Sequence, residues 1–283
     1  MNEIFYEAVS DPLSLSHPRS YKKSKKFLHV HDNAVECLLF ISGNVDYFIE
    51  NSIFSLKPGD MLLLPPGVIH GFLIGDDSLY ERIPIHIQVS MLNSLSTPHT
   101  NLMAAFEHPA NDNRLFHLDK QDFDQFVKYS DTIIQLMEQK PYGYDLMIQA
   151  DLLILLVLIN SAYQNACYKA EDISPVIIKK AIDYISLHLT ENISVQAIAD
   201  ELGISCSRLS HLFKEFTGSS VWNYVVARRL LLSRSLLMEG KAVIDACYES
   251  GFRDYANFSK AFSKTFRVSP GRYRKTLRPS ASD

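Results

Sequence analysis

The sequence predicts a two-domain α+β protein, with an amino-terminal β-barrel and trailing helices, followed by an all-α domain. Two observations support this prediction. Between residues 27 and 89, short β-favouring runs alternate with Gly, Pro and Asn turn signals, as in double-sheet sandwiches and barrels. Between residues 194 and 274, apolar residues at helical spacing predict two helix-turn-helix units joined by a long helix. A chain of 283 residues with 47% hydrophobic residues can bury two such cores.

Charge is distributed unevenly along the chain, although the formal net charge is only −4. Residues 1–174 contain 12 Lys and Arg against 22 Asp and Glu, whereas residues 175–283 contain 16 against 10. A basic carboxyl-terminal part beside an acidic remainder suggests a polyanionic partner for that end of the chain.

Cysteine usage and hydropathy favour a soluble cytoplasmic protein with no membrane partner. The chain has four widely spaced cysteines without a CxxC pair: Cys37, Cys167, Cys206 and Cys247. This pattern disfavours a disulfide framework or a zinc finger. The first residues lack the basic start and apolar core of a signal peptide. The longest apolar run, residues 152–159, has eight residues, whereas a membrane span needs roughly 20.

The expected barrel follows a lead-in, residues 1–26, which ends in a basic cluster at residues 22–26. Such a cluster is usually a solvated face. Strands are expected at residues 35–41, 45–49, 53–56 and 61–64, each bounded by turn residues. Residues 90–120 show weak periodicity and are expected to complete the barrel and lead to the helices.

Two spaced motifs within this region carry a family resemblance. The spacings His29-x-His31-x4-Glu36-x6-Gly43 and Gly59-x5-Pro65-x-Gly67-x2-His70 resemble the two signature motifs of cupin barrels. The chain departs from the family pattern at Ile74, where cupins often have Asn.

The cupin resemblance implies a site formed by His29, His31, Glu36 and His70. In cupin enzymes these positions bind a divalent metal, and three imidazoles with one carboxylate suit Zn, Fe, Ni or Mn. In cupins fused to a DNA-binding domain, the same positions more often line a metal-free pocket that binds a small effector. A buried strand histidine without a ligand is a further interpretation of His29. We expect no required cofactor, with a divalent metal as the alternative.

Apolar periodicity predicts a helix over residues 122–140 and, after Pro141 and Gly143, a second over residues 145–168. The second is apolar nearly all round, so it must be covered on more than one side. Burial under the barrel is one interpretation, and a contact between two copies of the chain is the other. We expect a homodimer.

The domain boundary is expected at the charged segment 169–175, which ends in Ser-Pro. Residues 1–168 would then form the effector-binding and dimerisation domain, and residues 176–283 the helical domain.

Each helix-turn-helix unit has the same local pattern. A short helix ends at a glycine, Gly203 or Gly251, and an N-capping residue, Ser205 or Asp254, begins the second helix. A helix over residues 221–238 joins the two units.

Residues 175–276 resemble the DNA-binding domain of the AraC family of bacterial transcription regulators. The matching residues are Ala199, Leu202, Gly203, Ser205, Leu209, Phe213-Lys214, Gly218, Arg229, Leu236-Leu237, Gly251-Phe252, Phe258, Phe262, Ser269-Pro270, Tyr273 and Arg274. The chain departs from the family at His211, where Arg is frequent, at Cys247-Tyr248, which replace Ile-Ala, and at Arg267, which replaces a helix-ending Gly. These departures leave the core positions intact, so they bear on which bases are read and not on the fold.

The AraC resemblance implies that two recognition helices enter successive major grooves about 34 Å apart. Residues pointing away from the packed Leu and Phe are the expected base contacts: Cys206, Ser207, Ser210, His211, Tyr255, Ala256, Asn257, Ser259 and Lys260. Asn257 can read adenine and Lys260 can read guanine. The expected phosphate contacts are Lys214, Arg253, Lys264, Arg272, Arg274 and Lys275.

The predicted function is therefore a ligand-responsive, sequence-specific transcription regulator and not an enzyme. Its expected partners are a double-stranded DNA operator, a small-molecule effector, a second copy of the chain and, for an activator, RNA polymerase. By family analogy the effector is a sugar or a sugar derivative. The first alternative is a metal-dependent cupin enzyme tethered to a DNA-binding module, with His29, His31, Glu36 and His70 as its active site. The second alternative is a regulator that needs no ligand.

Overall fold

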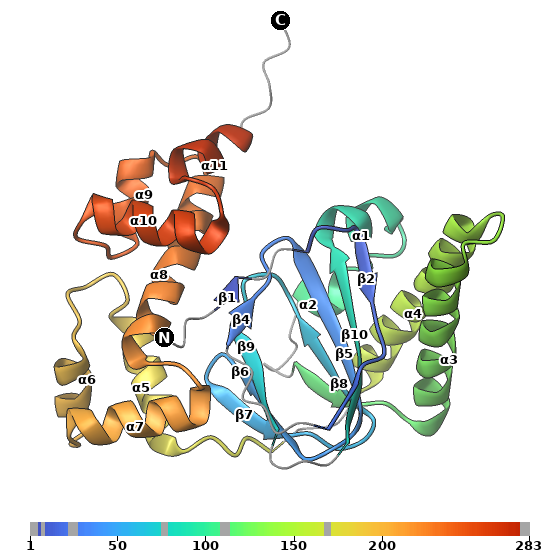
Figure 1. Ribbon diagram of the computed structural model, residues 1–283, viewed down its shortest axis with the longest axis horizontal. Coiled ribbons are helices and arrows are strands. Elements are labelled where there is room, and N and C mark those ends of the chain that lie inside the picture. The colour runs from blue at the N-terminus through green and yellow to red at the C-terminus, as the bar shows by residue number, and fades with distance from the viewer. Residues whose placement is uncertain are drawn as a thin grey trace, which may run out of the picture. The chain divides into compact units, whose positions relative to one another are not determined.

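The computed structural model describes residues 5–6, 9–21, 28–74, 79–107, 114–166 and 171–277 (Figure 1). These residues form two compact units. One unit is the amino-terminal barrel with its helices, up to residue 173. The other begins at residue 174 and also contains residues 5–6 and 28–29. The basic cluster at residues 22–26, Cys167 and the start of the predicted linker lie outside the described residues.

The barrel unit contains two sheets. The larger has strand order β11-β8-β5-β10-β2, with β3 pairing with β10. Its strands are β2 (Leu13–Leu15), β3 (Arg19–Ser20), β5 (Ala34–Ser42), β8 (Asp60–Leu64), β10 (Tyr80–Gln88) and β11 (Leu115–His117). In the other sheet, β4 (His29–Val30, of which Val30 belongs to the barrel unit), β9 (His70–Ile74), β6 (Val45–Ile49) and β7 (Ser52–Ser55) follow in this order.

Side-chain alternation along these strands creates two separate cores. Between the sheets lies an inner core that includes Leu38, Phe40, Tyr47, Leu62, Phe72 and Tyr80. On the outer face of the larger sheet, Val35, Cys37, Leu39, Ile83, Ile85 and Ile87 pack in one cluster with residues of the helices. Segment 90–120, for which the sequence pattern predicted no definite elements, contains most of α1 (Val89–Leu95), α2 (Ala104–Glu107) and β11.

Helices α3 (Lys120–Gln139) and α4 (Tyr144–Asn165) lie side by side against this outer face (Figure 1). They begin and end within three residues of the predicted bounds, and the turn between them uses left-handed backbone at Lys140 and Gly143. Among the residues that the structure describes, only one face of α4 is covered, so the predicted cover of a second side stays a prediction. Leu152, Leu155, Leu156 and Ile159 are fully buried, while Leu146 and Val157 are 67% and 48% exposed.

Helix α4 is long and apolar enough to cross a membrane by length and composition alone. Its buried residues, however, belong to the same core as the larger sheet. We therefore interpret α4 as a core helix of the barrel unit that leaves an apolar face open.

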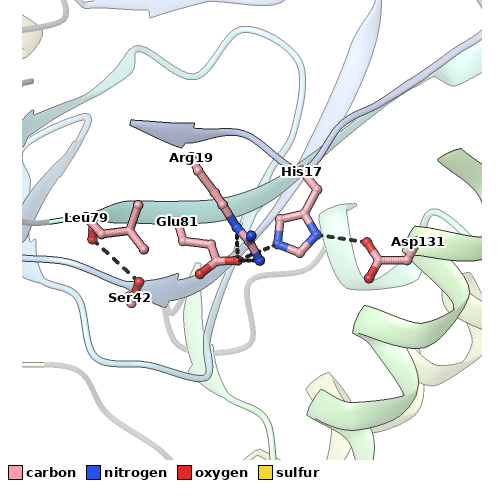
Figure 2. Close-up of polar contacts among 6 residues, drawn as sticks. All are labelled: His17, Arg19, Ser42, Leu79, Glu81 and Asp131. Atoms are coloured by element: carbon pink, nitrogen blue, oxygen red, sulfur yellow. Dashed lines mark hydrogen bonds and ion pairs between the residues drawn. The ribbon is translucent and has the colours of Figure 1, made fainter. Parts of the chain in front are cut away.

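A polar network ties α3 to the larger sheet (Figure 2). His17 lies between two carboxylates, with Nδ1 2.8 Å from Asp131 of α3 and Nε2 2.9 Å from Glu81 of β10. Arg19 donates from Nε to the same Glu81 oxygen at 2.7 Å. Because a neutral imidazole carries one N–H, only a protonated His17 donates to both carboxylates.

The second unit is helical. Its helices are α5 (Val176–Leu187), α6 (Val195–Glu201), α7 (Cys206–Thr217), α8 (Val221–Met238), α9 (Val243–Glu249), α10 (Tyr255–Phe266) and α11 (Pro270–Thr276). The long α8 joins the two helix-turn-helix units, as predicted (Figure 1). Strand β1 (Phe5–Tyr6) belongs to this unit, and its Tyr6 ring packs edge-on against Phe266 with centroids 4.8 Å apart.

The predicted caps and turns of both units are confirmed. Ser205 and Asp254 accept hydrogen bonds from the backbone N–H three residues further on. Gly203 and Gly251 have φ angles of 65° and 91°, the left-handed conformation that ends the preceding helix. Arg267 also adopts this conformation, with φ 60°, where the family often has Gly. The cost for a non-glycine residue there is about 1 kcal/mol.

Arg229 of α8 connects the long helix to the segment that follows α5. Its Nε donates to the Leu189 carbonyl at 2.8 Å and its Nη2 to the Glu191 carbonyl at 2.7 Å. A Cβ on Gly251 would lie 2.6 Å from the same Leu189 oxygen and 2.9 Å from the Arg229 Nε. Glycine at position 251 therefore allows both the left-handed backbone angle and the close approach to the segment after α5 and to Arg229 of α8.

Candidate functional sites

Helix α7 presents a polar face opposite its packed side. Leu209 and Phe213 are fully buried, which directs Ser207, Ser210 and His211 to solvent. Beside these side chains, Arg208 is exposed and adds a positive charge, and the His211 Nδ1 lies 3.7 Å from the carboxylate of Glu215 on the same helix. Base readout by hydroxyls and one imidazole is less selective than readout by Arg or Asn.

Cys206 differs from the other predicted base contacts of α7. It is half-buried, and its thiol donates to the Oε1 of Gln196 on α6 at 3.0 Å. This contact fixes the turn between α6 and α7 and directs the thiol towards its own domain.

Helix α10 offers a more selective set of side chains. Phe258, Phe262 and Phe266 form the packed side. Tyr255, Ala256, Asn257 and Lys260 are exposed, and Ser259 is half-buried. An amide and an ammonium on one exposed helix face match the hydrogen-bonding edges of adenine and guanine.

The predicted phosphate contacts divide into two groups. Five of them are exposed: Lys214, Arg253, Lys264, Arg272 and Lys275. Arg274 is half-buried, and its Nη2 donates to the Gly240 carbonyl at 3.2 Å, after the end of α8. Arg274 therefore has a structural contact that the sequence did not indicate, and we revise its role towards holding α11 against that turn.

Inside the barrel, three histidines surround one buried carboxylate. The Glu36 Oε2 lies 2.9 Å from the Nε2 of His70, 3.4 Å from that of His31 and 3.6 Å from that of His86. The Nδ1 of His70 donates to the Val68 carbonyl at 2.9 Å. Burial alone would raise the pKa of Glu36, but contacts with the three imidazoles outweigh it and hold the pKa well below the ordinary value. Glu36 is therefore ionised in this site.

The predicted quartet also has the composition of a metal site. His29, His31, Glu36 and His70 are all buried, and each offers a ligand atom within 4.8 Å of the others. Because the His70 Nδ1 donates to a backbone carbonyl, the Nε2 of the same ring faces the cluster. This is the usual orientation of a metal-bound histidine. The donor set therefore fits a divalent transition metal.

Both units match known protein families. Residues 198–276 match a model described as a helix-turn-helix domain, and residues 17–108 match one described as an AraC-like ligand binding domain. The probable transcription factor PqrA of Proteus vulgaris is 33% identical over 90 residues, which cover 31% of this chain and 74% of PqrA. The chain belongs to the AraC family of transcriptional regulators.

Other AraC-family relatives are similar over most of the chain. The arabinose operon regulatory protein of Salmonella typhimurium is 27% identical, over 78% of this chain and 76% of its own. The lactose operon transcription activator of Staphylococcus xylosus is 25% identical, over 90% and 95% of the two chains. Among solved structures, ToxT from Vibrio cholerae is similar with 18% identity over 95% of this chain and a TM-score of 0.40.

The AraC-like ligand-binding match, residues 17–108, contains the whole histidine cluster, including one member that sequence reasoning missed. His86 lies outside both spaced motifs, and only the pairing of His86 with Glu36 between β10 and β5 brings it there. The helix-turn-helix match contains a second missed residue, Arg208, which is exposed on α7. Its basic charge in a recognition helix was the available signal.

Proposed function

We propose that this AraC-family regulator binds a specific DNA operator through α7 and α10 and responds to a small molecule bound in the barrel. The observation that carries the proposal is the exposed Asn257–Lys260 face of α10, in a compact unit that also contains α7. We assign base contacts mainly to α10, while α7 with Lys214 mainly positions the protein. Residues 1–168 serve as the sensor, residues 169–175 as the linker and residues 176–283 as the DNA-binding domain.

Selection of duplexes from a random pool by the full-length protein tests this proposal. We expect an enriched site with two sequence blocks about one helical turn apart, one for each recognition helix. Fluorescence anisotropy at several salt concentrations should then show tighter binding to the enriched duplex than to a scrambled one. Equal affinity for both duplexes at every salt concentration would contradict sequence-specific binding.

We propose a sugar or sugar derivative as the effector. Two relatives are named as regulators of the arabinose and lactose operons. The ionised Glu36 with His31, His70 and His86 offers the polar groups that hydroxyl-rich ligands require inside the barrel. A panel of pentoses, hexoses and disaccharides should contain members that raise the midpoint of thermal unfolding and change operator affinity. If none changes either quantity, the alternative without a ligand is favoured.

We further propose a homodimer formed through α4. Its uncovered face carries Leu146, Met147, Ile154 and Val157, all exposed, at the spacing of one helical stripe. A second copy of α4 would bury this apolar stripe, as in paired helices of other oligomers. The cytoplasm is the proposed site of action, and RNA polymerase is a further partner if the regulator activates transcription.

A metal-dependent enzyme tethered to DNA is the second candidate, because the quartet of His29, His31, Glu36 and His70 fits a divalent metal. If bound, the metal would supply Lewis-acid chemistry, and these four residues would hold it. Metal analysis of the purified protein distinguishes the candidates. Stoichiometric Fe, Mn, Zn or Ni, lost in His31→Ala and His70→Ala, would favour the enzyme. A metal-free protein that binds its operator would exclude it, and we propose no catalytic activity and no required cofactor.

A further inference from the structure

A second polar site lies on the inner face of β10, away from the histidine cluster. The guanidinium carbon of Arg82 lies 4.3 Å from the ring centroid of Tyr80 and 5.3 Å from that of Phe72. Arg82 is half-buried and Tyr80 is fully buried. Arg82 and His86 lie on the same strand face but four residues apart, about 13 Å along the strand.

Both polar groups of this site lack a hydrogen-bond partner within the part of the chain that the structure describes. The Nη1 of Arg82 and the hydroxyl of Tyr80 are buried and unpaired. Stacking on the two rings stabilises the positive charge but leaves the directional N–H donor unsatisfied. Buried donors without acceptors are rare in native proteins. The unpaired donors of Arg82 and Tyr80 therefore indicate a binding position for an acceptor group of a ligand.

Neither neighbouring carboxylate is available to Arg82. Glu81 precedes it in the sequence, but strand alternation places Glu81 on the outer face, where His17 and Arg19 engage it (Figure 2). Glu36 pairs with His86 and belongs to the histidine cluster, four residues further along β10 from Arg82. The acceptor must therefore come from outside the described residues of the barrel.

We propose that Arg82 and Tyr80 form an anion subsite, so that the effector is an acidic sugar derivative with a carboxylate or phosphate group. The guanidinium fork matches the oxygens of both groups, and the Tyr80 hydroxyl adds a second donor. Burial raises the pKa of Tyr80, so its hydroxyl keeps the proton that it donates. This inference rests on the proposed effector function of the barrel and specifies its ligand class.

Calorimetric titration of the full-length protein with matched sugars tests the proposal. The probes are glucose, glucuronate and glucose 6-phosphate, with galactose, galacturonate and galactose 6-phosphate as a second series. We expect one acidic member to bind at least about tenfold more tightly than its neutral parent, and the two acidic arms distinguish carboxylate from phosphate. No preference for any acidic member over its parent would overturn the proposal.

Variants locate the effect. Arg82→Gln and Tyr80→Phe should each weaken binding of the acidic sugar about tenfold and leave binding of the neutral parent unchanged. Arg82→Lys should lose part of the affinity for the acidic sugar, because lysine keeps the charge but lacks the two parallel N–H donors of the guanidinium. Arg19→Gln is the matched control, because its guanidinium pairs with Glu81 on the outer face, and it should change affinity less than about twofold. Equal weakening of neutral and acidic sugars by Arg82→Gln and Arg82→Lys would overturn the assignment.

Two further measurements separate the possible failures. Asp76 and Asp77, which lie between β9 and β10 in the sequence and outside the described residues, are the carboxylates that remain as acceptors from the chain itself. The double variant Asp76→Asn, Asp77→Asn should leave acidic-sugar affinity unchanged. An increase of about tenfold would assign the acceptor to the chain and overturn the proposal. Operator affinity should be unchanged in ligand-free Arg82→Gln. If the wild-type protein binds its operator but no acidic sugar, the proposed anion subsite is wrong and the proposed DNA-binding function is retained. If the protein binds no specific DNA, the proposed function itself is wrong.

Discussion

At the level of single residues, the exposed side chains of α10 differ chemically from those of α7. Asn257 and Lys260 carry the groups that distinguish adenine and guanine, whereas α7 offers hydroxyls, an imidazole beside Glu215 and one guanidinium, that of Arg208. Both sets are held by buried Leu and Phe residues on the opposite side of their helices. The two recognition helices are therefore expected to contribute unequally to specificity.

Replacing base contacts should change specificity. We expect Asn257→Ala and Lys260→Ala each to weaken binding to the selected operator by about 1–3 kcal/mol, with little change on scrambled DNA. Arg272→Ala, at an exposed phosphate position, should weaken both duplexes alike and flatten the salt dependence. Anisotropy titrations measure all three, and equal losses on both duplexes for Asn257→Ala would contradict the assignment.

Gly251 should tolerate no side chain. Gly251→Ala would place a methyl group 2.6 Å from the Leu189 oxygen, in addition to straining the backbone at φ 91°. We expect a loss of about 3 kcal/mol or more in the free energy of unfolding. Gly203→Ala is the matched control, because it has φ 65° but open space, and it should cost only about 1 kcal/mol. Similar losses for both variants, measured by chemical denaturation, would disprove the steric argument.

At the level of elements, α3 is joined to β10 by a polar contact as well as by the apolar core. His17 belongs to neither element, yet its ring bridges Asp131 and Glu81 (Figure 2). Charge-assisted hydrogen bonds in a partly buried site contribute more than surface ion pairs.

Removing this bridge should weaken the barrel unit. We expect His17→Ala to lower the free energy of unfolding by about 1.5–3 kcal/mol, because Asp131 and Glu81 lose a shared donor. The exposed His99→Ala should stay within about 0.5 kcal/mol of wild type. Denaturant titrations of both variants provide the comparison, and equal effects would mean that the bridge adds no stability.

The open face of α4 predicts the oligomeric state. We expect Ile154→Glu to shift the protein from dimer to monomer in light scattering, because a charge would be buried at the centre of the apolar stripe. Gln149→Glu adds the same charge at an exposed polar position of the same helix and should leave the dimer intact. A dimer that persists in Ile154→Glu would place the interface elsewhere.

At the level of the whole molecule, a ligand in the barrel and DNA on the helical unit must influence each other reciprocally. If effector changes operator affinity by some factor, operator must change effector affinity by the same factor. Titration of effector with and without saturating operator DNA tests this coupling. A typical coupling of about 1–3 kcal/mol is expected, and affinities that are independent of each other would show that the barrel does not regulate DNA binding.

The features that the sequence by itself determined are those that depend on residues close together in the chain. The caps Ser205 and Asp254, the left-handed Gly203 and Gly251 and the apolar stripes of α7 and α10 depend on residues a few positions apart, so pattern reasoning identified them. The spaced histidine motifs were recognisable for the same reason, since each lies within one short segment.

Only the tertiary structure decided the contacts made between distant segments. Pairing of β10 with β5 brings His86 to Glu36, and alternation on β10 directs Arg82 inward while Glu81 turns outward to His17. The open face of α4 follows from which side the barrel covers, and Arg274 meets Gly240 only because α11 returns to the end of α8. Such contacts depend on strand register and helix packing, which no local pattern of residues specifies.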